Sequence, residues 1–191
     1  MRSRLAAAIT ALALIGALPI SATAVASRPR ATSASAYVNP FRSPAWSVSR
    51  TDMGVDMIAS ARTPVLAVGD AVILGSDSHA RWPGKHYIYY QLTAGSHAGD
   101  IIYVAEHLKG LLPAGTIVHA GQRIATALPG YPFTEWGWAD QYGSPRAYPC
   151  YREGRVTNSG REMARFLASL GSAILAGVHR QGSDAPIGRR C

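Results

Sequence analysis

Cysteine and clustered positive charge are both scarce in this sequence. Only two of its 191 residues are cysteines, Cys150 and Cys191, so the chain is not a disulfide-rich scaffold. The formal net charge is +8, but the arginines are dispersed along the chain and form no basic cluster. Because no nucleic-acid-binding motif accompanies this charge, we expect no nucleic-acid partner.

Long apolar runs are also missing, apart from a short one near the N-terminus. The run from residue 5 to residue 20 is too short for a confident membrane span. It follows Arg2 and Arg4 and precedes small residues that permit cleavage after Ala24 or Ala26, which is the pattern of a secretory signal peptide. We therefore expect a secreted protein without stable membrane insertion, with an uncleaved anchor as the alternative.

Composition divides the chain into four parts. Residues 1–26 are the predicted signal peptide, and the polar stretch 27–36 is a predicted flexible leader. Residues 37–140 are the predicted β domain, and residues 141–191 are predicted to form a loop, a helix and a tail packed on it. Cleavage after residue 26 leaves about 165 residues, enough for one domain with a real core. The mature net charge would be 17 − 11 = +6.

The middle of the chain is patterned as β-strands and turns. Runs rich in valine, isoleucine, leucine and aromatic residues alternate with glycine-containing turns, and none has a 3.6-residue period. The expected strands are 64–68, 71–75, 86–93, 100–108, 116–119, 122–127 and 134–139. The first two are expected to form a hairpin across Gly69-Asp70, and 116–119 and 122–127 another across Ala120-Gly121. We predict a mainly β fold, an antiparallel sheet or sandwich.

Alternation along the last strand separates two indoles from a glutamate. Trp136 and Trp138 lie on one face of 134–139, and Glu135 and Gly137 on the other. Two indoles are expected to be buried, so we expect Glu135 and Gly137 to face outward over the sheet.

Two carboxylates flank a residue that permits a bend. Asp52 and Asp56 would lie about 13 Å apart in a straight strand, but a bend at Gly54 would bring them together. Alternation places His107 on one face of its own strand. We predict that Asp52, Asp56, His107 and Glu135 line one groove.

A helix is predicted near the C-terminus. Ser159 and Glu162 form a capping box after a loop rich in proline, glycine and arginine. Apolar residues then recur at helical spacing: Met163, Phe166, Leu167, Leu170, Ile174 and Leu175. We expect one amphipathic helix from about 160 to 176 with its apolar side on the β domain; binding to a membrane surface is the lesser alternative.

Five short blocks of sequence follow one another in order between residues 37 and 140. They are Asp52-Met53-Gly54-Val55-Asp56, Thr63-Pro64-Val65-Leu66-Ala67-Val68-Gly69-Asp70, Glu106-His107-Leu108, His119-Ala120-Gly121-Gln122-Arg123-Ile124 and Glu135-Trp136-Gly137-Trp138. Together they resemble the lysostaphin-type, LytM-like zinc endopeptidases of peptidoglycan. The resemblance implies a duplicated-hybrid-motif β fold with an active-site groove over the sheet.

The sequence departs from this family at the metal ligands. The resemblance implies zinc ligands at Asp52, Asp56 and Gly137, and catalytic groups at His107 and Glu135, yet only Asp56 and His107 match the family's residue types. Catalytic zinc takes imidazole or thiolate ligands, whereas two carboxylates suit calcium or magnesium better. We expect no zinc cofactor, and a divalent cation at Asp52 and Asp56 only if one is bound at all.

Three functions are compatible with these residues. We favour a degenerate, non-catalytic module that binds peptidoglycan, another anionic wall polymer or a wall-associated partner. One alternative is an active zinc metalloendopeptidase of peptidoglycan cross-links, with an altered metal site and with His107 and Glu135 in catalysis. The other is a regulatory partner of a wall hydrolase. Structural roles stay open: turn formation for Asp52 and Asp56, a sheet hydrogen bond for His107, and an arginine partner for Glu135.

The two cysteines generate the first testable prediction. Outside the cell an even cysteine count favours a disulfide, with an intermolecular bridge or two free thiols as alternatives. Closing a loop of roughly 40 residues would stabilise the fold by about 4 kcal/mol in the chain-entropy model. Mass spectrometry of the oxidised protein is expected to find a peptide linking Cys150 to Cys191, and reduction should lower the melting temperature. Alkylation of both thiols in the native protein would contradict this pairing.

Overall fold

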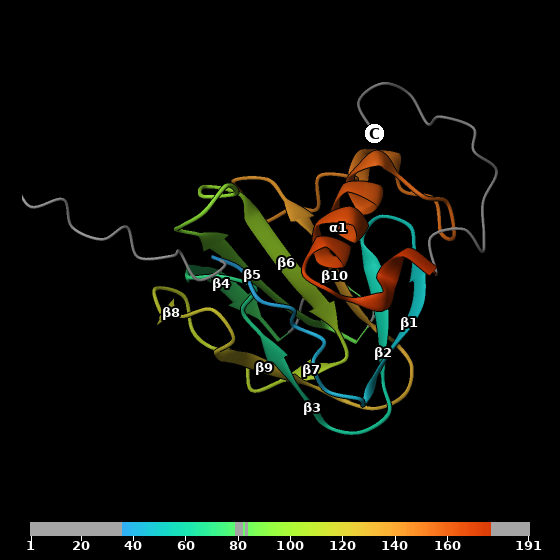
Figure 1. Cartoon of the computed structure of the whole chain (residues 1–191), viewed down its shortest axis with the longest axis horizontal. Helices are drawn as coiled ribbons and strands as arrows, with labels where there is room; N and C mark the ends of the chain where they lie inside the picture. Colours follow the sequence, from blue (N-terminus) through green and yellow to red (C-terminus); the bar gives the residue numbers. More distant parts are fainter. Residues whose placement is uncertain (1–35, 79–81, 83, 177–191) are drawn as a thin grey trace, which may run out of the picture. The chain divides into compact units, whose positions relative to one another are not determined.

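A large antiparallel sheet organises the described part of the protein. The structure is a computed structural model and describes residues 36–78, 82 and 84–176. The strand order across the seven-stranded sheet is β1 (Trp46–Thr51), β2 (Val55–Ala59), β10 (Thr134–Ala139), β6 (Ile101–Glu106), β5 (His86–Leu92), β4 (Ala71–Asp77) and β8 (Ile117–Val118). A second sheet has the order β3 (Thr63–Leu66), β9 (Arg123–Ala127) and β7 (Leu108–Lys109) (Figure 1). The predicted mainly β, antiparallel fold is confirmed.

Several predicted segments lie outside the described residues. They are the signal peptide, all of the leader except Ala36, and the tail from residue 177. Cys150 ends the short 3-10 helix η1 (Tyr148–Cys150), and there is no free thiol in the described ranges. Because Cys191 is not among them, the disulfide stays a prediction. No helix in the described ranges is long and apolar enough to cross a membrane.

The main core lies on one face of the large sheet. That face packs against the three-stranded sheet and against helix α1 (Asn158–Ser169). Trp136 is fully buried there and makes edge-to-face contacts with Trp46 and Phe41, with ring centroids 5.2 and 4.7 Å apart. Trp138 packs on Phe166 of α1 at 5.2 Å. The predicted burial of both indoles is therefore confirmed, as is the strand that carries them.

Both predicted short hairpins are wrong in their pairing. Strand β3 pairs with β9 in the small sheet, whereas β4 pairs with β5 and β8 in the large sheet. Gly69-Asp70 therefore carries the chain from one sheet to the other, and Ala120-Gly121 does the same between β8 and β9. The longer connection across 94–99 joins neighbouring antiparallel strands, β5 and β6.

Helix α1 begins and ends earlier than its apolar spacing predicts. Its N-cap is Thr157, whose side chain accepts a hydrogen bond from the Gly160 N–H at 3.0 Å. The predicted cap, Ser159, lies inside the first turn. At the other end Gly171 has a φ of +86°, a conformation that suits glycine and ends the helix. A 3-10 helix, η2 (Ala173–Ala176), continues the chain to the end of the described residues.

Thr157 also ties the helix start to the turn between β1 and β2. Its backbone N–H and its hydroxyl each donate to the carbonyl oxygen of Asp52 at 2.9 Å. Thr157→Ala removes both the cap and this side-chain bond, so we expect a loss of about 1 to 3 kcal/mol in unfolding free energy. Thr157→Ser keeps the hydroxyl and should lose less, as measured by urea unfolding. Equal losses in the two variants would show that the hydroxyl does not stabilise this junction.

Candidate functional site

Strand register places charged residues opposite one another at one end of the large sheet. Arg50 of β1 pairs with Asp56 of β2, and Asp56 pairs with Glu135 of β10. Glu135 in turn pairs with Ala105 of β6. Side chains directly opposite in adjacent strands lie close enough to interact, so the register brings an arginine and two acids into one row.

Three carboxylates converge in this row, and we call them the acidic cluster: Asp52, Asp56 and Glu135. One ligand oxygen of each lies within 4.8 Å of the others. The turn from β1 to β2 brings Asp52 to Asp56, as predicted, and the Asp52 N–H donates to the Gly54 carbonyl at 3.0 Å. All three residues are buried: the exposed fraction is 0% for Asp52, 2% for Asp56 and 4% for Glu135.

The expectation that Glu135 and Gly137 face outward is wrong. The segment between β10 and α1, residues 140–157, covers this face of the sheet, and we call it the covering segment. The Tyr87 hydroxyl donates to the Gly143 carbonyl at 2.5 Å, and the Gly154 N–H donates to Asp52 Oδ2 at 3.2 Å. Alternation predicts which face a side chain is on, but not what packs against that face.

The guanidinium of Arg50 lies against the acidic cluster. Its Nε is 2.6 Å from Asp56 Oδ2 and 3.3 Å from Asp52 Oδ2. A second nitrogen is 3.0 Å from Glu153 Oε1 in the covering segment. Burial opposes the charge on this arginine, but the hydrogen bond to Glu153 and the charge of Asp56 hold the pKa of Arg50 above its ordinary value.

A tyrosine ring occupies the space beside Gly137. Gly137 pairs with Tyr103 of β6, and a Cβ on Gly137 would overlap the Tyr103 ring, coming within 2.5 Å of the hydroxyl oxygen. The Tyr103 hydroxyl donates to Glu135 Oε1. Tyr103 also stacks on Tyr87, with ring centroids 5.5 Å apart and planes 12° apart. The position implied as the third zinc ligand is therefore packed with aromatic carbon.

Burial and mutual repulsion favour the protonated forms of Asp56, Glu135 and Glu106. Burial and the charge of Asp52 raise the pKa of Asp56 to about 6. Burial and the charge of Asp56 raise the pKa of Glu135 well above its ordinary value. The same causes raise the pKa of Glu106 to about 8. Glu106 has a φ of +83°, rare for a residue with a side chain, and its carboxylate accepts from Trp82 Nε1 at 3.1 Å.

His107 is not one of the three residues whose ligand atoms converge. It lies between β6 and β7, and its Nδ1 is buried without a hydrogen-bond partner among the described residues. Its predicted role in a groove therefore stays a prediction. The residues that sequence reasoning missed are Arg50, Glu106 and Glu153. A signal for Arg50 existed, because a hairpin centred on 52–54 sets it opposite Asp56.

These residues do not fit a catalytic zinc ion. The convergent donors are three carboxylates with no imidazole, Gly137 offers no donor, and Tyr103 fills its side-chain space. Catalytic zinc sites combine imidazole or thiolate ligands with an open coordination position. A buried cluster that already holds a guanidinium offers neither the ligands nor the open position.

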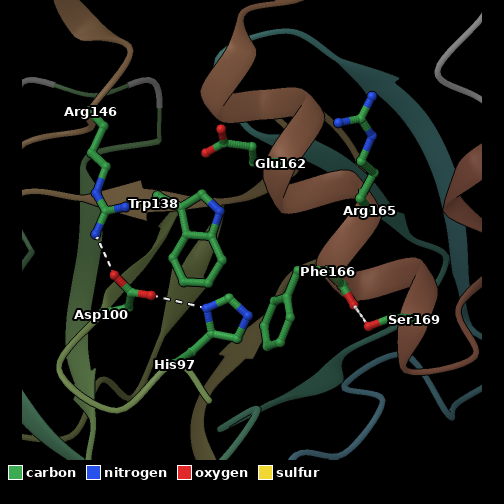
Figure 2. A pocket seen from close by; sticks show the side chains of 8 residues that line it. All are labelled: His97, Asp100, Trp138, Arg146, Glu162, Arg165, Phe166 and Ser169. Carbon is green, nitrogen blue, oxygen red and sulfur yellow. Dashed lines mark hydrogen bonds and ion pairs between the residues drawn. The ribbon is translucent and has the colours of Figure 1, made fainter.

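A separate pocket of about 370 Å³ lies between α1 and the end of β10. Figure 2 shows the eight residues that line it: His97, Asp100, Trp138, Arg146, Glu162, Arg165, Phe166 and Ser169. Asp100 accepts from His97 Nδ1 at 2.9 Å and from Arg146 at 2.8 Å. Burial works against the charge of Asp100, but these two partners hold its pKa below its ordinary value.

No protein-family model and no curated protein matches the chain. Among solved structures, it is similar to lysostaphin in an NMR solution structure, with 16% identity over 81% of this chain and 60% of that chain and a TM-score of 0.48. A second similar structure is the antimicrobial peptidase lysostaphin from Staphylococcus simulans, with 15% identity, 75% and 56% coverage and a TM-score of 0.44. The chain thus spans about three fifths of each solved chain.

The raised pKa values predict that the fold loses stability as pH rises. Folding raises the pKa of Asp56 from 3.8 to about 6 and that of Glu106 from 4.5 to about 8. The stabilisation of the fold that these shifts represent is complete below about pH 4. It is lost as the pH rises through about 6 for Asp56 and about 8 for Glu106. The melting temperature is expected to fall between about pH 5 and pH 9. Glu106→Gln, which stays neutral, should flatten the upper part of this fall. A melting temperature that rises over this range would contradict the prediction.

Proposed function

We propose that this chain is a secreted, non-catalytic module of the lysostaphin-like type that binds peptidoglycan or another anionic wall polymer. Three features support the proposal. The motif order resembles the wall endopeptidases, the residues at the implied zinc position do not fit zinc, and an accessible pocket combines aromatic rings with arginine side chains. The arrangement of Arg50 and Tyr103 around the acidic cluster is the observation that carries the non-catalytic part.

Hydrolysis of a peptide bond needs a polarised carbonyl and an activated water at an accessible site. Asp52, Asp56 and Glu135 are each at most 4% exposed, and residues 140–157 lie over them. A peptide substrate would have to displace this segment, including the Asp52 bonds to Gly154 and Thr157, before it reached a carboxylate. The acidic cluster therefore serves the fold, and binding takes place elsewhere.

The pocket beside α1 is lined by aromatic rings and by charged groups of both signs, the arginines Arg146 and Arg165 and the acids Asp100 and Glu162. Trp138, Phe166 and His97 form its aromatic wall, with His97 stacked on Trp138 at 5.3 Å and in tilted contact with Phe166 at 4.7 Å. Its volume is within the usual range for small-ligand sites, about 300 to 1,000 Å³. Aromatic faces contact sugar rings and methyl groups, while charged rims select the sign of the ligand.

Two arginines supply positive charge at the rim of this pocket. Arg146 lies over the Trp138 ring at 5.6 Å from its centroid and is held there by Asp100. Arg165 comes from α1 and forms no ion pair within the described part of the chain. An arginine without a protein partner remains able to bind a carboxylate of wall material through paired N–H donors.

Sedimentation with purified, insoluble peptidoglycan tests the proposal. The mature protein is expected to co-sediment, to release no soluble fragments, and to bind equally in EDTA and in added zinc. Arg165→Glu should weaken binding about tenfold or more, because it replaces one charge-assisted contact with a repulsion. Arg62→Glu is the matched control, since Arg62 is also exposed but lies in the turn between β2 and β3.

Three outcomes would contradict this proposal. Fragment release that EDTA abolishes would establish a metal-dependent hydrolase. Equal binding by the Arg165→Glu and Arg62→Glu variants would show that the wall contact lies outside the pocket. If the wild-type protein did not co-sediment, the protein would not bind peptidoglycan.

A further inference from the structure

The carboxylate oxygens of the acidic cluster lie close enough together to hold a cation, and the positive group that contacts them is the Arg50 side chain. Three carboxylates present oxygens within 4.8 Å of one another in a buried setting. One of these oxygens, Asp56 Oδ1, is buried and has no hydrogen-bond partner among the described residues. Buried polar groups are usually satisfied, so an unpartnered carboxylate oxygen in this position indicates an unused ligand.

Arg50 is the residue that supplies positive charge at this position. Its Nε contacts the Oδ2 atoms of both aspartates at 2.6 and 3.3 Å. A calcium or magnesium ion would need to lie about 2.0 to 2.6 Å from carboxylate oxygens in the same space. The guanidinium and a divalent cation therefore compete, both for room and through repulsion of like charge.

We infer that the Arg50 guanidinium takes the place of a divalent cation at Asp52, Asp56 and Glu135, and that removal of this guanidinium leaves a binding site for a hard cation. The donors are all oxygens, which favour calcium, magnesium or manganese over zinc. Three protein oxygens leave the remaining coordination positions to water or to backbone carbonyls. The inference concerns this cluster alone and does not depend on wall binding.

The replacement also explains how the covering segment is held. The guanidinium that contacts Asp56 also contacts Glu153 of the covering segment. The N–H of the following residue, Gly154, donates a hydrogen bond to the Asp52 carboxylate. A guanidinium has donors in several directions, so one residue neutralises the aspartates and contacts the segment above them. A hydrated metal ion would also neutralise the carboxylates. It would not supply the hydrogen bond that the Arg50 side chain donates to Glu153.

The test compares melting temperatures of the mature wild-type protein and Arg50→Met in EDTA and in about 10 mM calcium, magnesium or manganese chloride, above the Kd range of weak extracellular calcium sites. Methionine fills space similar to the arginine stem without charge or N–H donors. We expect Arg50→Met to be less stable than wild type in EDTA. At least one of the three cations should then raise its melting temperature by about 5 to 10 °C, the shift for a ligand near 100 times its Kd.

Three controls separate this site from general ionic effects. Wild type and Arg62→Met should show no cation-dependent shift, because Arg50 is still present in both. Arg50→Lys keeps a positive charge and should also show none. Arg50→Met combined with Glu135→Gln loses one of the three ligands and should lose most of the shift seen with Arg50→Met alone.

Each result decides the inference. A wild-type protein stabilised by the cations as strongly as Arg50→Met would show that the guanidinium does not occupy the ion's place. Arg50→Met without a response to any of the three cations, whether folded in EDTA or unfolded and not refolded by them, would overturn the inference. A shift that persists unchanged in the double variant would place the cation at other residues.

Discussion

A buried carboxylate must be protonated or neutralised, and this requirement governs one whole end of the large sheet. The register of β1, β2 and β10 places Arg50, Asp56 and Glu135 in one row, and the β1–β2 turn adds Asp52. An isolated ionised carboxylate is very costly in a low-dielectric interior. The Arg50 guanidinium neutralises the aspartates. Glu135 accepts a hydrogen bond from the Tyr103 hydroxyl, and its raised pKa favours the neutral, protonated form.

The C-terminal part of the chain depends on the same residues. Asp52 accepts hydrogen bonds from Thr157 through its carbonyl and from Gly154 through its carboxylate, so the start of α1 is fixed to the β1–β2 turn. A Cβ on Gly160 would overlap the Asp52 carbonyl, which shows how closely the helix approaches. Substitutions in the acidic cluster should therefore affect the position of α1 and, through it, the pocket that α1 lines.

Sequence reasoning predicted those parts of the fold whose contacts are local. Strands β5, β6 and β10 and the burial of Trp136 follow from alternation and from turn residues. The predicted hairpins at 69–70 and 120–121 are wrong because β3 and β9, which are far apart in the sequence, pair with each other. No short sequence pattern specifies such a long-range strand pairing. The predicted C-terminal end of the helix is wrong because the apolar spacing continues past Gly171, whereas the positive φ of this residue ends the helix.

The candidate site was predicted in part for the same physical reason. The bend that joins Asp52 to Asp56 is local, and Glu135 was placed on the correct strand. Its burial was missed because residues 140–157 have no periodicity that indicates which surface they cover. This covering has a consequence for binding: it removes the acidic face of the sheet from contact with large polymers. The opposite side, where α1 leaves a pocket beside Trp138 and Arg146, remains accessible. There the Asp100 contacts hold His97 and Arg146 in position, so a ligand bound in this pocket would meet side chains that lose little further conformational freedom.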